Sequence, residues 1–191
     1  MFINRKTQEL HLKIVYYGPA LAGKTTNLQY IHTHTNPVKR SDLVSIKTQE
    51  DRTLFFDFMQ LELSRIKGLR PRFSLYTVPG QVRYEATRRL VLQGVDGVVF
   101  VADSQRHRLA DNLVSLAGLH QHLGERGLPV RLFPFVLQCN KQDLPTALDP
   151  LLLKASLGRN GIPCFASVAV DGAGVLETLK AIISRVVRQM H

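Results

Sequence analysis

Residues 18–25 carry the clearest chemical signal in the sequence, Gly-Pro-Ala-Leu-Ala-Gly-Lys-Thr. They match the pattern G-x-x-x-x-G-K-[ST], in which the backbone N–H groups of a glycine-rich loop surround phosphate groups. In such a loop Lys24 places its charge on the β- and γ-phosphates, and the Thr25 hydroxyl binds Mg²⁺. The pattern therefore predicts a nucleotide site made by Gly18, Pro19, Ala20, Leu21, Ala22, Gly23, Lys24, Thr25 and Thr26.

A second motif discriminates between the purine bases. Asn140-Lys141-Gln142-Asp143 follows an apolar run that ends at Cys139, in the pattern N-K-x-D. A carboxylate at Asp143 can accept hydrogen bonds from guanine N1–H and from the exocyclic 2-amino group, and adenine lacks both donors. Unmet hydrogen bonds of this kind can reject an analogue by ~10⁴-fold. We therefore predict guanine, with Asn140 bracing the base and the loop and the stem of Lys141 covering the base plane.

Both motifs need a scaffold whose strands end at one edge of a sheet. Apolar runs alternate with helical patterns, predicting strands at 12–17, 53–63, 73–78, 97–102, 132–139 and 164–168 and helices at 24–35, 109–123, 150–157 and 175–190. Residues 38–52 are predicted to be a loop, and the short link 64–72 makes its flanking strands antiparallel. The prediction is a three-layer α/β fold over residues 1–191, with a six-stranded, mostly parallel sheet that contains one antiparallel pair. Ligands then lie beyond the carboxyl ends of the strands.

The composition is that of an ordinary soluble domain. Of the 191 residues, 45% are hydrophobic and 21% are charged, which argues against disorder. Two cysteines are too few for a disulfide framework, and the sequence shows no secretory signal or lipid-attachment motif. No apolar run approaches the ~20 residues of a membrane span. We therefore expect a cytoplasmic protein with no integral membrane segment.

With these motifs, the chain resembles a Ras-type small GTPase over essentially its whole length, and more narrowly the bacterial mutual-gliding (MglA-type) GTPases. The narrower resemblance is carried by KIVYYGP at 13–19, EDRTLFFDF at 50–58, TVPGQ at 77–81 and GVDGVVFVADS at 94–104. It implies a Ras-like P-loop GTPase fold with GTP or GDP and Mg²⁺ as ligands. It also implies a GTP-hydrolysing switch, slow without an activating partner, that controls bacterial cell polarity or surface motility.

The resemblance further implies roles for residues outside the glycine-rich loop. Thr53 would complete the Mg²⁺ shell with the threonine of that loop, and its backbone would sense the γ-phosphate. Gly80 would contact the nucleotide, and Gln81 would orient the attacking water. Arg52 would act as an arginine finger supplied in cis, because its planar guanidinium stabilises charge on phosphate oxygens. Ala169 matches a weaker motif whose backbone N–H meets the guanine oxygen.

Two residues depart from the Ras-type pattern. Thr77 occupies the position where small GTPases have an aspartate that holds a Mg²⁺-bound water, a departure that the gliding family shares. Ala20 occupies the position of a glycine, and its methyl group points toward the space that Gln81 and Arg52 must enter in the transition state. These departures leave a second function open: a nucleotide-gated module that recruits effectors and hydrolyses GTP negligibly. A third, a nucleotide or small-molecule kinase, needs a lid and an acceptor site that the sequence does not show.

The expected partners follow from the resemblance and from charge. The resemblance implies a dimeric Roadblock-fold (MglB-type) activating protein, polarity or motility effectors, and a chain that is monomeric alone and is recruited to a cell pole or the inner membrane surface through partners. The net charge of +10 favours an acidic partner. Half of this excess lies in residues 61–90, where a solvated face and a docking face for an acidic effector or an anionic membrane both remain open. No pattern of aromatic residues is interleaved with these charges, so we expect no nucleic acid.

Overall fold

The computed structural model describes residues 2–47, 55–66, 68–81, 84–128, 133–158 and 161–189. Its strands are β1 (Phe2–Asn4), β2 (Glu9–Tyr17), β3 (Val44–Lys47), β4 (Phe55–Glu62), β5 (Arg70–Thr77), β6 (Gly97–Asp103), β7 (Phe135–Asn140) and β8 (Cys164–Ser167). Its α-helices are α1 (Lys24–His34), α2 (Glu85–Val91), α3 (Leu109–Gly124), α4 (Pro150–Ser156) and α5 (Val175–Arg188), with short 3₁₀ helices at Pro37–Lys39 and Arg106–Arg108.

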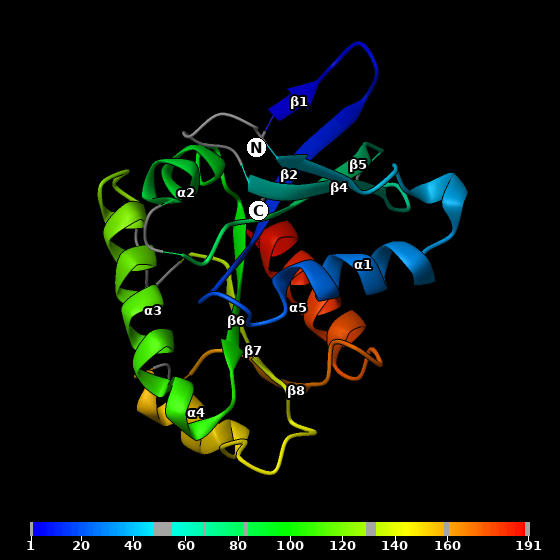
Figure 1. Ribbon diagram of the computed structural model, residues 1–191. Helices are drawn as coiled ribbons and strands as arrows, with labels where there is room; N and C mark the ends of the chain where they lie inside the picture. The colour runs from blue at the N-terminus through cyan, green and yellow to red at the C-terminus, as the bar shows by residue number, and fades with distance from the viewer. Residues whose placement is uncertain are drawn as a thin grey trace.

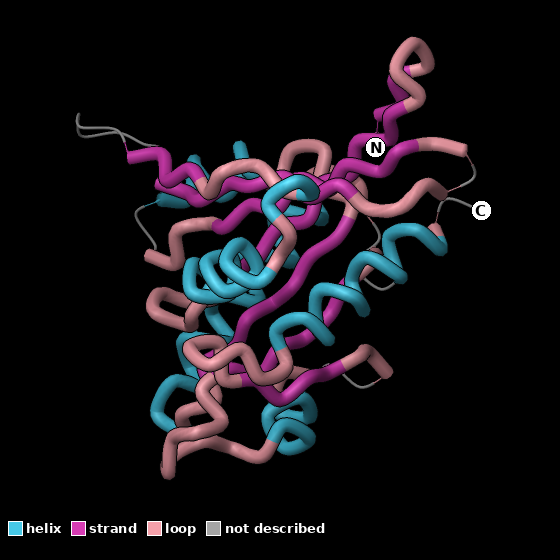
Figure 2. The backbone as a smooth tube through the Cα atoms, turned by 90° about the vertical axis from the view of Figure 1, so that its right-hand side faces the viewer, coloured by secondary structure: helices cyan, strands magenta, loops and turns pink. Residues whose placement is uncertain are grey.

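The strands form one sheet in the order β3-β4-β5-β2-β6-β7-β8, and β1 pairs with β2 as a hairpin beside this path. The pairs β2–β5, β2–β6, β6–β7 and β7–β8 are parallel, whereas β3–β4 and β4–β5 are antiparallel. Two views at right angles show the sheet between helices on its two faces, with the β1–β2 hairpin projecting from one end (Figures 1 and 2). The carboxyl ends of the parallel strands therefore share one edge.

The hydrophobic core has two halves, one on each face of the sheet. The alternating side chains of β2 show the division: Leu12, Ile14 and Tyr16 belong to one half, and Val15 and Tyr17 belong to the other. Helices α1 and α5 cover the first half, while α2, α3 and α4 lie on the opposite face (Figure 1). A sheet buried on both faces requires apolar residues at both alternations of its central strands, which explains their continuous apolar runs.

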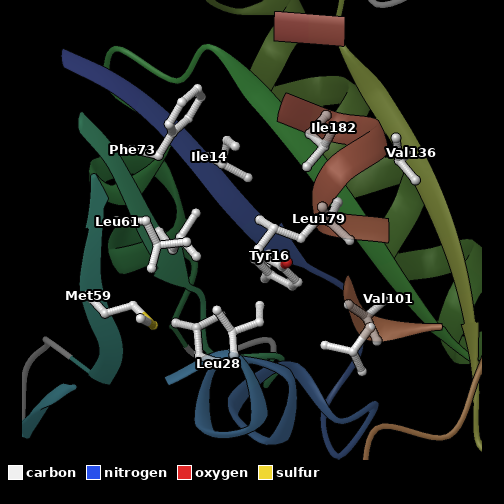
Figure 3. Close-up of a cluster of buried hydrophobic side chains, with 14 of the residues drawn as sticks. Ile14, Tyr16, Leu28, Met59, Leu61, Phe73, Val101, Val136, Leu179 and Ile182 are labelled. Carbon is white, nitrogen blue, oxygen red and sulfur yellow. The ribbon is translucent and has the colours of Figure 1, made fainter. Parts of the chain in front are cut away.

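Figure 3 shows the half of the core that α1 and α5 cover. Leu28 of α1, together with Leu179 and Ile182 of α5, packs against the side chains of Ile14 and Tyr16 on β2. Truncating a buried leucine of this kind to alanine typically costs about 2–5 kcal/mol. This packing fixes the first turn of α1 relative to the end of β2, which is the geometry that the glycine-rich loop needs.

The predicted fold class is confirmed, but the strand count is higher than six. The prediction of a loop over 38–52 is wrong where β3 forms, and β1 was not predicted. Both are short, half-exposed strands with a single partner strand, so neither shows a buried apolar run. Helix α2 was also not predicted, because seven residues are too few for a helical period to stand out. Among the described helices, none combines the length and apolar character that crossing a bilayer requires.

Candidate nucleotide-binding site

The glycine-rich loop joins the carboxyl end of β2 to the first turn of α1. Gly18 and Gly23 have φ angles of +143° and +97°, which favour glycine. A Cβ atom at Gly18 would lie 2.1 Å from the carbonyl oxygen of Val101 on β6, so only glycine fits there. Helix α1 begins at Lys24 with no side-chain cap and no acidic residue in its first turn. Its first N–H groups and the positive end of its dipole are thus available to an anion.

A cavity of about 610 Å³ lies against this loop. It is lined by two segments far apart in the sequence: Ala20, Leu21, Gly23, Lys24, Thr25 and Thr26 from the loop and α1, and Thr77, Val78, Pro79, Gly80, Gln81 and Tyr84 from the end of β5 and the approach to α2. The structure therefore brings Gly80 and Gln81 to the same cavity as Lys24 and Thr25. This is the arrangement that nucleotide chemistry at the phosphate end would require.

Lys24 is a buried cation at the base of this loop. Its side chain is 7% exposed, and Nζ donates hydrogen bonds to the carbonyl oxygens of Gly18 at 3.0 Å and Pro19 at 2.6 Å. Burial, together with the positive charge of Arg88, lowers the pKa of Lys24 to about 7, against an opposing effect of Asp57. A buried ammonium group gains from an anionic partner, so this lysine favours a phosphate in the cavity.

Asn140 ties three loops together at the end of β7. Its Nδ2 donates to the carbonyl oxygen of Ala22 at 2.8 Å, and its Oδ1 accepts from Ala169 N at 2.9 Å and from Ser167 Oγ at 3.1 Å. A Cβ atom on Gly23 would lie 2.2 Å from Asn140 Nδ2, which is a second reason for glycine there. The glycine-rich loop, the N-K-x-D motif and the segment with Ala169 thus form one connected assembly.

The other residues of the N-K-x-D motif lie at the surface of this assembly. Lys141 has a φ of +68°, and its Nζ donates to Oδ2 of the buried Asp103 at 2.7 Å. Asp143 is exposed, so its carboxylate is accessible to a ligand. The N–H of Ala169 already donates to Asn140 in this structure. A guanine oxygen at Ala169 would therefore share or replace that bond.

Thr25 lies beside a carboxylate that the sequence analysis did not identify as functional. Its Oγ1 donates to Oδ2 of Asp57 on β4 at 2.6 Å, and the hydroxyl of Thr77 donates to the same oxygen at 2.9 Å. Hydroxyl and carboxylate oxygens are hard donors that suit Mg²⁺. The described residues contain no group of three or more histidine, cysteine, aspartate or glutamate side chains that could hold a metal alone. The Thr25 hydroxyl and the Asp57 carboxylate are oxygen donors of the kind that fits a Mg²⁺ ion, whose other ligands would be phosphates and water.

Two predicted residues, Arg52 and Thr53, lie outside the described residues, so their roles stay predictions. The missed Asp57 could have been suspected from the sequence, because it is a charged residue inside the aromatic run 55–58. An acidic side chain between aromatic residues, when it is buried, requires polar partners.

Comparison with known proteins gives one family and several relatives. A family model described as the ADP-ribosylation factor family matches residues 1–186. The chain is 50% identical over 189 residues to the mutual gliding-motility protein MglA of Myxococcus xanthus (strain DK1622), covering 99% of this chain and 97% of that protein. It is 29% identical to ADP-ribosylation factor-like protein 6 of Caenorhabditis briggsae, over 78% of this chain and 70% of that protein. The corresponding protein of Caenorhabditis elegans is 25% identical, over 94% of this chain and 89% of that protein.

Proposed function

Because this chain belongs to the ADP-ribosylation factor family of Ras-like small GTPases, we propose that it is a GTP-hydrolysing switch that controls bacterial cell polarity or surface motility. The observation that carries the enzymatic part is the shared cavity, where Lys24 and Thr25 meet Gly80 and Gln81. The motility part rests on the similarity to a relative whose name is mutual gliding-motility protein.

The proposed reaction is in-line attack of water on the γ-phosphate of GTP. The bond from the γ-phosphorus to the β–γ bridging oxygen breaks, and GDP and inorganic phosphate leave. Lys24 pairs with the β- and γ-phosphates, Gln81 orients the water, and Arg52 stabilises charge on the phosphoryl oxygens. Mg²⁺, when bound at Thr25 and Thr53, supplies positive charge that offsets the charge of the phosphates.

The proposed partner is a dimeric Roadblock-fold protein of the MglB type that activates hydrolysis by repositioning Arg52 and Gln81 rather than by inserting an arginine of its own. Before hydrolysis, the GTP-bound chain would recruit polarity or motility effectors. We further propose that the chain works in the cytoplasm and reaches a cell pole or the inner membrane surface through these partners.

A single-turnover assay distinguishes this proposal from the alternative function, a nucleotide-gated module that recruits effectors and hydrolyses GTP negligibly. The purified chain is loaded with GTP and Mg²⁺, and phosphate release is followed with and without a Roadblock-fold dimer. We expect slow release alone and a large acceleration with the dimer. Intact GTP after prolonged incubation with a dimer that binds the chain would favour the module instead.

Replacing Arg52 with alanine is expected to abolish the stimulated hydrolysis and leave GTP affinity nearly intact. An arginine that acts only on transition-state charge contributes to the rate and not to ground-state binding, and such arginines are worth roughly 10³-fold or more. The measurement is phosphate release with the Roadblock-fold dimer. Arg188→Ala, at an exposed arginine near the end of α5, is the matched control and should behave like the wild type. Wild-type stimulation of Arg52→Ala would refute the assignment.

Replacing Ala20 with glycine is expected to raise the single-turnover rate by roughly tenfold. Ala20 and Gln81 line the same cavity, so the Ala20 methyl group is expected to take up space that Gln81 and the attacking water need. Relieving about 1–2 kcal/mol of overpacking accounts for a factor of this size. Ala20→Val, which adds bulk, should lower the rate. If Ala20→Gly cleaves GTP at the wild-type rate, the methyl group is no obstacle.

A further inference from the structure

Asp57 is a buried carboxylate held by three hydroxyl groups. It is 4% exposed, and its Oδ2 accepts from Thr25 Oγ1 at 2.6 Å and from Thr77 Oγ1 at 2.9 Å. Its Oδ1 accepts from Ser45 Oγ at 2.6 Å. The three donors come from α1, β5 and β3, so four elements meet at this one carboxylate.

The pairing of the strands explains why these residues meet. Asp57 is the register partner of Ser45 in the β3–β4 pair. In the antiparallel β4–β5 pair Phe58 is the register partner of Tyr76, so the next residues, Asp57 and Thr77, lie close to each other. The backbone N–H of Asp57 donates to Thr77 Oγ1 at 2.8 Å. Thr77 thus both accepts from the backbone of Asp57 and donates to its side chain. A hydroxyl used in this way fixes the position of the carboxylate.

Asp57 forms no salt bridge with another described residue, although the positive charge of the buried Lys24 lies near enough to attract it. Within the part of the chain that the structure describes, every side chain hydrogen-bonded to Asp57 is a neutral hydroxyl, and no lysine or arginine forms a salt bridge with it. Buried charges are normally paired with an opposite charge or coordinate a metal. A carboxylate offers about four acceptor positions, so the three hydroxyls leave room for a further donor. A cation and its water at Thr25 would supply a directly bound positive charge, in addition to the nearby charge of Lys24, and also that donor.

We propose that Asp57 is the carboxylate of the Mg²⁺ site in this chain, supplied from β4 in place of a carboxylate at position 77. By accepting the hydrogen bond from Thr25 Oγ1, Asp57 turns the lone pairs of that hydroxyl toward the Mg²⁺ position, and its free acceptor position would take a hydrogen bond from a water bound to Mg²⁺. Thr77 is a positioning residue for Asp57. The inference rests on the proposed function, and it gives a carboxylate to a site where the sequence shows Thr77 in place of the usual aspartate.

The test measures how Mg²⁺ controls the release of a fluorescent GDP analogue. Bound Mg²⁺ is expected to slow the release of the analogue. In Asp57→Asn the Mg²⁺ concentration at which this slowing is half-maximal should rise by tenfold or more, while the release rate in EDTA stays within about threefold of the wild type. Glu62→Gln makes the same carboxylate-to-amide change further along β4, where the side chain is partly exposed, and should leave the Mg²⁺ dependence unchanged. Wild-type Mg²⁺ dependence in a folded Asp57→Asn variant overturns the inference.

A second, independent test transfers the carboxylate from position 57 on β4 to position 77 on β5 and measures the same Mg²⁺ dependence. The double variant Asp57→Asn/Thr77→Asp should recover Mg²⁺ dependence to within about threefold of the wild type. Thr77→Asp alone would place two carboxylates side by side, so it should lower the melting temperature and not tighten Mg²⁺. A clear gain in Mg²⁺ affinity in Thr77→Asp alone overturns the inference even if Asp57→Asn does not fold.

The wild type separates a failure of this inference from a failure of the proposed function. If the wild type binds no guanine nucleotide, with or without Mg²⁺, the proposed function fails as well. If the wild type binds guanine nucleotide and only the variants behave differently from what is expected, the inference alone fails.

Discussion

Replacement of Lys24 by alanine is expected to lower the affinity for GTP by about 10³-fold. Hydrogen bonds to charged groups contribute about 1.5–3 kcal/mol each, and Lys24 is expected to make at least one to each of two phosphates. The same ammonium is buried and donates to the backbone oxygens of Gly18 and Pro19, and burial lowers its pKa to about 7. The cation is therefore costly without a ligand and is stabilised when phosphates arrive.

The measurement is a titration of GTP into each purified variant by calorimetry, with thermal melting of the nucleotide-free proteins beside it. The melting temperature of Lys24→Ala should change little, because the variant removes a buried charge along with its two hydrogen bonds. Lys180→Ala, at an exposed position on α5, is the matched control and should bind GTP like the wild type. Binding of GTP by Lys24→Ala within tenfold of the wild type would contradict the role assigned to the lysine.

The second large effect is expected for Asp143→Asn, which should lower GTP affinity by about 10³-fold and raise the affinity for xanthosine triphosphate. An asparagine can still accept from N1–H, but its amide donates where guanine presents a 2-amino donor, so one good hydrogen bond becomes a clash of donors. Xanthine carries an oxygen at that position and accepts from the amide instead. Asp143 is exposed, so the change should leave the fold intact.

Competition for a bound fluorescent GDP analogue by GTP and by xanthosine triphosphate measures this change. Asp149→Asn is the matched control: Asp149 Oδ1 caps α4 by accepting from Leu151 N and Leu152 N, and asparagine caps equally well. The control should keep the wild-type preference. An Asp143→Asn variant that still prefers GTP by a wide margin would mean that another group reads the base.

The phosphate and base motifs could be predicted from the sequence because their residues are adjacent in the chain. Gly18, Lys24 and Thr25 lie within eight consecutive residues, and the structure shows at Gly18 and Gly23 the positive φ angles that glycine favours. The contacts of Asn140 with Ala22 and Ala169 were harder to predict, because they join three segments that are far apart in the sequence. Only the parallel strand order β2-β6-β7-β8 brings these segments to one edge of the sheet.

Asp57 could not be placed at the Thr25 hydroxyl from the sequence alone. Its contacts depend on the register of the β4–β5 pair, and a shift of one residue would turn its side chain to the other face of the sheet. They also depend on β3, the edge strand that the sequence analysis predicted to be a loop. Neither the register nor the edge strand leaves a local signal in the sequence. The position of the Asp57 carboxylate beside Thr25 was therefore recognised only from the structure.

The most direct test of the account is an equilibrium competition on the wild-type protein with Mg²⁺ present. A fluorescent GDP analogue is bound first, and unlabelled GTP or ATP is then added in increasing amounts. GTP should displace the analogue at nearly stoichiometric concentration, whereas ATP should leave it bound even at a thousandfold excess, as expected for a ~10⁴-fold preference. Equal displacement by ATP and GTP, or an analogue that never binds, would contradict the assignment of this chain as a guanine-nucleotide switch.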